Sequence, residues 1–193
     1  MLEEKQKKES ESIIKQLINE GKIINPNQKV ESFFLDKSST ALQVSKKLFE
    51  ISEDKNNHFD GYTWIINIAY YSMFYAATAL LAHFNHRIKS EVGVHKLTYH
   101  ALVYYFLIDD NKLQNHFIEQ YKESYEDAEQ LLQISEEKAV EMIEYLNFEH
   151  TKRIKFTYDV GEVAERNKAK TSLKRAEDFL TEVKKMIIYK MIK

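Results

Sequence analysis

The chain has 193 residues, a formal net charge of −2 and no cysteine. This length is enough for one domain with a substantial core, and the nearly balanced charge gives no general tendency to bind polyanions. The lack of cysteine excludes disulfides, thiolate metal sites and a cysteine nucleophile, and it fits a reducing cytoplasm. Four glycines and one proline are too few for many strands and tight turns. We therefore expect a single, cytoplasmic, all-α domain over residues 1–193.

The first half of the chain contains two predicted helices. Residues 3–20 carry apolar side chains at helical spacing and are followed by Gly21, a typical residue just after a helix, so residues 1–30 are expected to form a peripheral N-terminal helix and turn. The next helix has an apolar stripe at 3-4-3 spacing, which is typical of a face turned to a core. Its members are Ala41, Val44, Leu48 and Ile51.

The segment from Gly61 to His86 contains no Asp, Glu, Lys or Arg. It is long enough to cross a bilayer, which takes ~20 apolar residues, but it includes several polar side chains and no second such segment follows. A helix that is apolar on all sides is also what the centre of a bundle requires. We expect residues 62–84 to form a buried core helix, paired in antiparallel fashion with a helix over 94–108, with no membrane contact.

The second half predicts further helices around this pair. Residues 112–133 have helical spacing, and Ser135 with the acids that follow it is typical of a new helix start. The last helix shows an apolar stripe at 3-4-3-4 spacing, formed by Leu173, Ala176, Leu180, Val183 and Ile187. Together these elements predict an up-and-down helical bundle.

Two motifs resemble the central helices of HEPN-domain proteins. They are "AYYSMFYAATALL" (69–81) and "HKLTYHALVYYF" (95–106), and the late segment "AKTSLKRAEDFL" (169–180) is similar to the last helix of an uncharacterised archaeal and bacterial branch of that family. The resemblance implies an all-α HEPN-like bundle and frequent homodimers. It also implies, for many members, metal-independent RNA cleavage in toxin–antitoxin pairs with a minimal nucleotidyltransferase.

The resemblance also implies a catalytic arginine and histidine between the two central helices, which here are Arg87 and His95. Seven residues separate them, more than in the active family pattern, and Ile88 stands where a polar residue usually follows the arginine. A histidine serves as acid or base and an arginine stabilises phosphorane charge, so two protomers related by a twofold axis would supply a full set. The longer spacing predicts weak or absent turnover, because misplacement by ~1 Å can cost ~100-fold in rate.

Charge is distributed unevenly along the chain. Residues 109–149 hold 12 acidic and 3 basic side chains, net −9, whereas residues 150–193 hold 6 acidic and 12 basic ones, net +6. Such segments often solvate and complement one another, and the alternative is a basic face that contacts phosphate. The candidates for phosphate or RNA contact are Lys89, Arg153, Lys155, Arg166, Lys170 and Lys174.

Other kinds of chemistry find little support in the sequence. There is no glycine-rich phosphate loop and no Glu-x-x-His pair, and the histidines lack a carboxylate at ligand spacing, so we expect no metal and no cofactor. The predicted function is a HEPN-like module that binds RNA or nucleotide and is at most a weak or degenerate endoribonuclease. The alternative is a non-catalytic helical module that binds another protein. The sequence leaves open whether the protein is an enzyme.

Overall fold

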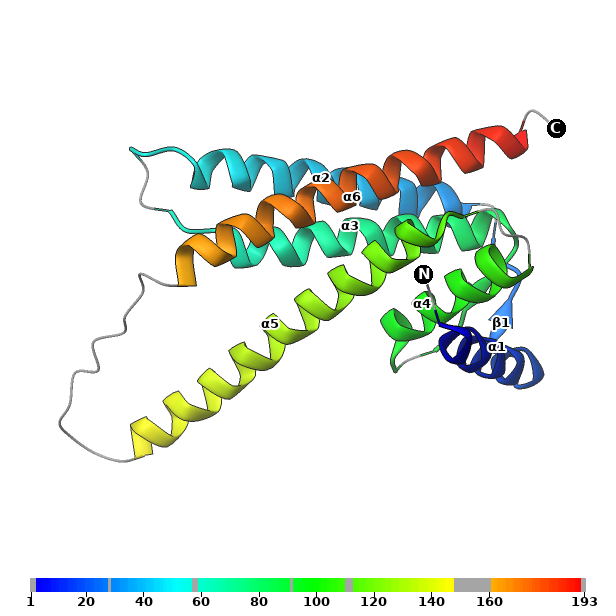
Figure 1. Ribbon diagram of the computed structural model, residues 1–193, viewed down its shortest axis with the longest axis horizontal. Coiled ribbons are helices and arrows are strands. Elements are labelled where there is room, and N and C mark those ends of the chain that lie inside the picture. The colour runs from blue at the N-terminus through cyan, green and yellow to red at the C-terminus, as the bar shows by residue number, and fades with distance from the viewer. Residues whose placement is uncertain are drawn as a thin grey trace.

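The computed structural model describes residues 3–27, 29–56, 59–90, 92–109, 113–147 and 161–191, with side chains described up to Leu131 in the fifth helix and from Glu165 to Ile188 in the last. The chain is mostly helical (Figure 1), which confirms the all-α prediction. Its helical elements are α1 (Glu4–Asn19), α2 (Lys29–Ser52), α3 (Tyr62–His83), α4 (Val94–Val103), the π-helical η1 (Tyr104–Asp109), α5 (Asn115–Asn147) and α6 (Gly161–Met191).

Helix α1 ends as its sequence predicts. Gly21 adopts a left-handed backbone conformation with φ of 67°, which a residue without a side chain reaches at little cost. Its amide donates to the carbonyl of Ile18, and the amide of Lys22 donates to that of Leu17. These two bonds form a Schellman motif, which satisfies carbonyls that the end of a helix would otherwise leave free.

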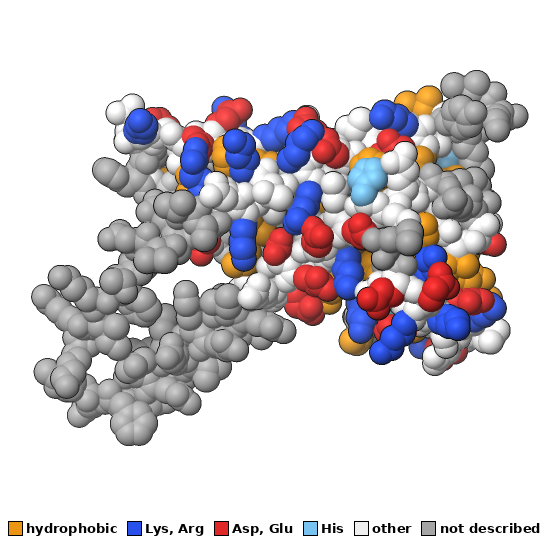
Figure 2. Space-filling view, in the orientation of Figure 1, with side chains coloured by type: hydrophobic (Ala, Val, Ile, Leu, Met, Phe, Trp, Pro, Cys, Tyr) orange, Lys and Arg blue, Asp and Glu red, His pale blue; other side chains and the backbone are white. Residues whose placement is uncertain are grey.

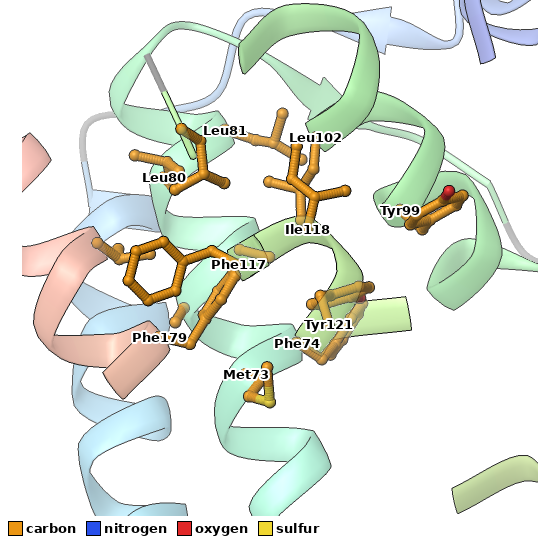
Figure 3. Packing of buried hydrophobic residues seen from close by; sticks show 14 of the residues in the cluster. Met73, Phe74, Leu80, Leu81, Tyr99, Leu102, Phe117, Ile118, Tyr121 and Phe179 are labelled. Carbon is orange, nitrogen blue, oxygen red and sulfur yellow. The ribbon is translucent and has the colours of Figure 1, made fainter. Parts of the chain in front are cut away.

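The core is built around α3, because every side of this helix except one is covered. Helices α2 and α6 run along it, and α4 and the first half of α5 cover another side (Figure 1). Figure 3 shows Leu80 and Leu81 of α3 facing Leu102 of α4 and Ile118 of α5, while Phe179 of α6 lies beside Phe117. Burial on these sides therefore explains why α3 contains no Asp, Glu, Lys or Arg.

Close packing of α2 on α3 depends on small residues. The Ser38 hydroxyl donates to the Ser72 carbonyl at 2.8 Å, and the Ser72 hydroxyl donates to the Ser38 carbonyl at 2.9 Å. One heptad later, the Ser45 hydroxyl donates to the carbonyl of Ile65 at 3.0 Å. These pairings show that the two helices are antiparallel, since position numbers rise on one and fall on the other.

The predicted core stripe of α2 is confirmed only in part, since Leu48 packs against a buried cluster that includes Tyr62 and Ile65. Its buried residues are Ser38, Leu42 and Ser45, whereas Val44 is 44% exposed. Ala41, Leu48 and Ile51 are only partly buried. Serine occupies the buried positions because its small side chain lets the backbones of α2 and α3 approach each other, and its hydroxyl donates to main-chain carbonyls.

The predicted antiparallel pairing of α3 with the following helix was also wrong. His95, at the start of α4, packs against Phe74 in the middle of α3, with 4.2 Å between ring centroids. Beyond the end of α4, Phe106 packs against Phe84, just past the end of α3, at 5.0 Å. Contacts rise together along both helices, so α4 runs in the same direction as α3. The connection between them must return along α3, so the fold is not a simple up-and-down bundle.

Part of that connection forms the short strand β2 (Arg87–Ile88), which the sequence did not predict. It pairs antiparallel with β1 (Ile23–Ile24), and Ile23 lies opposite Ile88. The amide of Lys89 extends the pairing by donating to the carbonyl of Lys22. This ribbon ties the segment after α1 to the α3–α4 connection and satisfies backbone groups that no helix contains.

Of the predictions for the last two helices, the one for α5 was wrong and the one for α6 is confirmed. Helix α5 continues through Ser135, so the expected new helix start there was wrong. Serine and glutamate are both tolerated inside a helix, so their order alone does not end one helix and begin another. In α6 the predicted stripe is confirmed, since Ala176, Leu180, Val183 and Ile187 are all buried and Leu173 packs against the core.

One helix in the described part of the chain, α3, is long and apolar enough to cross a membrane by length and composition. In the fold, 72% of the apolar window of this helix is buried among the other helices. Burial of that extent is what a central core helix shows.

Hydrogen exchange provides a direct check of this arrangement. We expect the amides of α3 and of the buried part of α4 to exchange most slowly, because their exposure requires opening of the common core. Exchange should be measured by mass spectrometry on the intact chain. If α3 proved to be among the least protected segments, the assignment of α3 as the centre of the fold would be wrong.

Candidate functional site

The candidate site is centred on His95, in the first turn of α4. Its ring lies against Tyr70, Tyr71 and Phe74 of α3, with ring centroids 4.2 to 5.6 Å apart. The Nδ1 atom is 2.7 Å from the hydroxyl of Tyr70. Burial lowers the pKa of His95, so the imidazole is neutral at pH 7. This histidine is therefore held in place and uncharged.

The opposite ring nitrogen of His95 is available to a ligand. Nε2 has no hydrogen-bond partner among the described residues, and unlike Nε2 of His83 and His100 it is not enclosed in the core. The adjacent ring of Tyr71 is 39% exposed. A ligand with a polar group attached to a flat ring system would fit here. Its polar group can hydrogen-bond to Nε2 while its flat ring stacks on the ring of Tyr71.

The start of α4 adds favourable electrostatics. Gly93 is the N-cap, with a left-handed φ of 69° and no side chain to cap the helix. The first free N–H groups of the helix therefore lie next to His95, where the helix dipole favours a negative charge. Lys96 follows with an exposed ammonium group. Sequence reasoning had not singled out Lys96.

Arg87 and His95 are not brought together. No hydrogen bond or ring contact between these two described residues is present, and the neighbour of Arg87, His86, stacks on Tyr105 at 3.7 Å. Tyr105 lies ten positions beyond His95 along α4 and η1, which corresponds to ~15 Å of helix rise. Arg87 and Lys89 are both exposed, near the far end of α4 from His95. The two residues that the resemblance assigns to one catalytic site are thus not in contact within one chain.

Two of the three candidates for phosphate contact on α6, Arg166 and Lys174, are paired with acids. Arg166 donates two hydrogen bonds to the carboxylate of Glu53, at 2.5 and 2.6 Å, and Lys174 pairs with Asp178 at 2.6 Å. Lys170 is exposed. In Figure 2, positive and negative side chains alternate on the face shown and do not separate by sign. Arg153 and Lys155 lie outside the described residues.

The Glu53–Arg166 pair gives a pH-dependent prediction. Hydrogen bonding from Arg166 lowers the pKa of Glu53 from 4.5 to about 2, so its folded-state pKa is below its unfolded value. This contribution to stability is present above pH 4.5 and is lost as the pH falls towards 2. We expect Glu53→Gln to flatten the pH dependence of the free energy of unfolding in that window. Urea titrations at several pH values would measure it, with Glu50→Gln as the exposed control; identical slopes would contradict the prediction.

A second surface feature lies on the side of α2 and α3 that faces away from α6. On α3, Trp64, Ile68, Tyr71 and Tyr75 recur at 4-3-4 spacing, so they share one face, and Trp64 is 66% exposed. Tyr75 stacks on Phe34 of α2 at 5.9 Å, and the heptad steps from Phe34 place Ala41 and the neighbouring Val44 on the same side. We call this surface the open apolar face; it is formed by Phe34, Ala41, Val44, Trp64, Ile68, Tyr71 and Tyr75.

Metal ligation receives no support from the described side chains, where no group of three or more His, Asp and Glu residues is placed to hold an ion. His83 pairs instead with Glu31 at 2.9 Å, and His100 bonds to Ser10 of α1 at 2.9 Å. Both histidines thus join helices to one another, and neither contributes to the site around His95.

The chain matches none of the family models and none of the curated proteins with which it was compared. The interpretation of the site therefore depends on its own geometry. That geometry includes a partner, Tyr70, that no signal in the sequence assigned to His95. Its contact with His95 spans 25 positions, and no local spacing signals a contact made through a returning connection.

Proposed function

We propose that this protein is a HEPN-like helical module that binds RNA or a nucleotide through the start of α4 and cleaves RNA weakly or not at all. The observation that carries the proposal is a neutral His95 with an open Nε2, next to the uncapped N-terminus of α4 and the exposed ring of Tyr71. A helix N-terminus binds phosphate and an aromatic ring stacks on a base, so the site can bind both the phosphate and the base of a nucleotide.

Weak turnover follows from the cation arrangement. Transition-state charge on a phosphorane requires a cation held in contact with the reacting group, and arginine is best suited to that role. Arg87 makes no contact with His95 within one chain, and Arg166 is occupied by Glu53. A catalytic pair would need a second protomer that brings its Arg87 close to His95. The minimal nucleotidyltransferase partner and the toxin–antitoxin role are further proposals, which depend on the resemblance alone.

The proposal predicts a specific binding defect. His95→Ala should weaken binding of a fluorescein-labelled single-stranded RNA about tenfold, because one hydrogen bond to a charged group is lost together with part of the site. Fluorescence anisotropy at fixed salt would measure it, with EDTA present and absent, and gel analysis of the same samples would report cleavage. His116→Ala is the matched control, because His116 is an exposed histidine on α5.

Two outcomes would contradict this proposal. RNA affinity that does not change in His95→Ala would remove the site, and rapid EDTA-resistant cleavage that depends on His95 would refute the weak-activity part. Binding that vanishes only when salt is raised would indicate nonspecific attraction, since phosphate contacts alone weaken steeply with salt.

A second candidate function, protein interaction, is favoured by the open apolar face. Exposed aromatic and aliphatic side chains that share one face are characteristic of an interface. A homodimer is the partner we propose for it, as an alternative to nucleotide binding at Tyr71, because a dimer formed here would cover the exposed Tyr71 ring.

A further inference from the structure

Tyr70 gives the candidate site a property that the histidine alone does not have, and this inference depends on the proposed function. The Tyr70 side chain is 4% exposed, and its hydroxyl is within 2.7 Å of His95 Nδ1. Its ring is enclosed by Tyr71, Tyr121 and Tyr125, with centroids 5.8 to 6.0 Å away. The hydroxyl is therefore fixed with respect to the imidazole.

The direction of this hydrogen bond determines which imidazole nitrogen carries the proton. Burial raises the pKa of Tyr70 well above its usual range, so the phenol keeps its proton. A phenol is the stronger donor of the pair, and an unprotonated imidazole nitrogen is a much stronger acceptor than a phenol oxygen. Tyr70 therefore donates to Nδ1, and in a neutral imidazole the remaining proton then resides on Nε2.

We infer that Tyr70 is a positioning residue that holds His95 in the Nε2–H form, so that His95 presents a hydrogen-bond donor to a phosphate oxygen of the bound nucleotide or RNA. In this form His95 cannot remove a proton from a 2′-hydroxyl, because its open nitrogen has no free lone pair. The site binds phosphate next to the N–H groups of α4, and its histidine is set for recognition instead of base catalysis.

The tautomer can be observed without any ligand. Protein labelled with ¹⁵N in its histidine rings should show, in a long-range ¹H–¹⁵N spectrum, that His95 carries its proton on Nε2 and has an unprotonated Nδ1. Tyr70→Phe removes the hydroxyl and keeps the ring, and it should convert His95 to a mixture of both tautomers. Tyr71→Phe is the matched control, because the Tyr71 ring also contacts His95, at 5.6 Å, but its hydroxyl does not bond to it. Circular dichroism would verify that both variants are folded.

Two results of this experiment would overturn the inference. One is a wild-type spectrum with the proton on Nδ1, and the other is an unchanged tautomer in Tyr70→Phe. Neither result depends on RNA, so failure of the inference is distinguishable from failure of the proposed function.

A binding measurement tests the donor role. Glutamine can place an amide donor near the position of Nε2, whereas asparagine is too short, so His95→Gln should retain RNA affinity to within about threefold and His95→Asn should lose about tenfold. A 5′-mononucleotide used as competitor would separate nucleotide recognition from recognition of a longer chain. Equal losses in both variants would show that His95 does not act as an Nε2 donor.

Discussion

Replacement of Ser72 by leucine is expected to lower the free energy of unfolding by about 3 kcal/mol or more. Ser72 is fully buried between α2 and α3, and Ser38 faces it from α2. A leucine there adds volume to an interface that has no room for it. It also removes the hydroxyl that donates to the Ser38 carbonyl at 2.9 Å. Overpacking and a lost buried hydrogen bond act in the same direction.

The neighbouring residues explain why this interface cannot easily absorb the change. Ala69, Ala76 and Ala79 of α3 are all fully buried, so small side chains recur along the helix. Small side chains let two helices approach closely, and an interior packed at crystal-like density relaxes only partially around an added group. The helices must then separate, which disturbs the second contact between them, from Ser45 to the carbonyl of Ile65.

Urea unfolding followed by circular dichroism would measure this effect. Thr40→Leu is the matched control, since Thr40 lies on the same helix as Ser38 but is exposed, and surface substitutions usually stay within about 0.5 kcal/mol. Ser72→Ala should cost about 1 kcal/mol, because it removes the hydroxyl without adding volume. A Ser72→Leu variant as stable as Thr40→Leu would show that α2 and α3 are not packed as described.

The second large effect concerns self-association. We expect the wild type to be dimeric at micromolar concentrations and the double variant Val44→Glu, Trp64→Glu to be monomeric at the same concentrations. Val44 and Trp64 are 44% and 66% exposed, so the substitutions leave the core intact. In a dimer formed through the open apolar face, they would bury four like charges without partners, and each buried unpaired charge costs several kcal/mol.

Sedimentation velocity over a range of concentrations would measure the association. The control is Ile18→Glu with Ile188→Glu, which changes two exposed apolar residues, 44% and 55% exposed, on α1 and α6, outside the open apolar face. The control should remain dimeric. A wild-type protein that sediments as a monomer would contradict the dimer, and a dimer unaffected by the double variant would assign the interface to another surface.

The sequence determined the parts of this protein that depend on local spacing. The uncharged run predicted α3 almost to the residue, Gly21 marked the end of α1, and the stripe of α6 identified its buried side. Each of these signals is contained within one helix, where the spacing of side chains fixes which of them share a face. The scarcity of glycine and proline likewise predicted the all-α class.

The sequence could not determine features that depend on which helices meet. The stripe of α2 was assigned to the core by its apolar character, yet Ser38 and Ser45 are buried because α3 is near enough for their hydroxyls to reach its carbonyls. Arg166, Lys170 and Lys174 are four residues apart, so helical spacing alone places them on one side of α6. Only the fold revealed that Arg166 lies next to Glu53, 113 positions away.

The direction of α4 decided the candidate site. From sequence, Arg87 and His95 are close neighbours across a short connection, so proximity was the natural expectation. The pairing of β2 with β1 holds Arg87 near the end of α3, whereas the rest of the connection carries His95 back to Tyr70 and Phe74. The sequence therefore determined that a histidine would begin this helix, and the tertiary structure alone decided that its partner is a tyrosine instead of an arginine, because strand pairing and core packing fix where a connection leads.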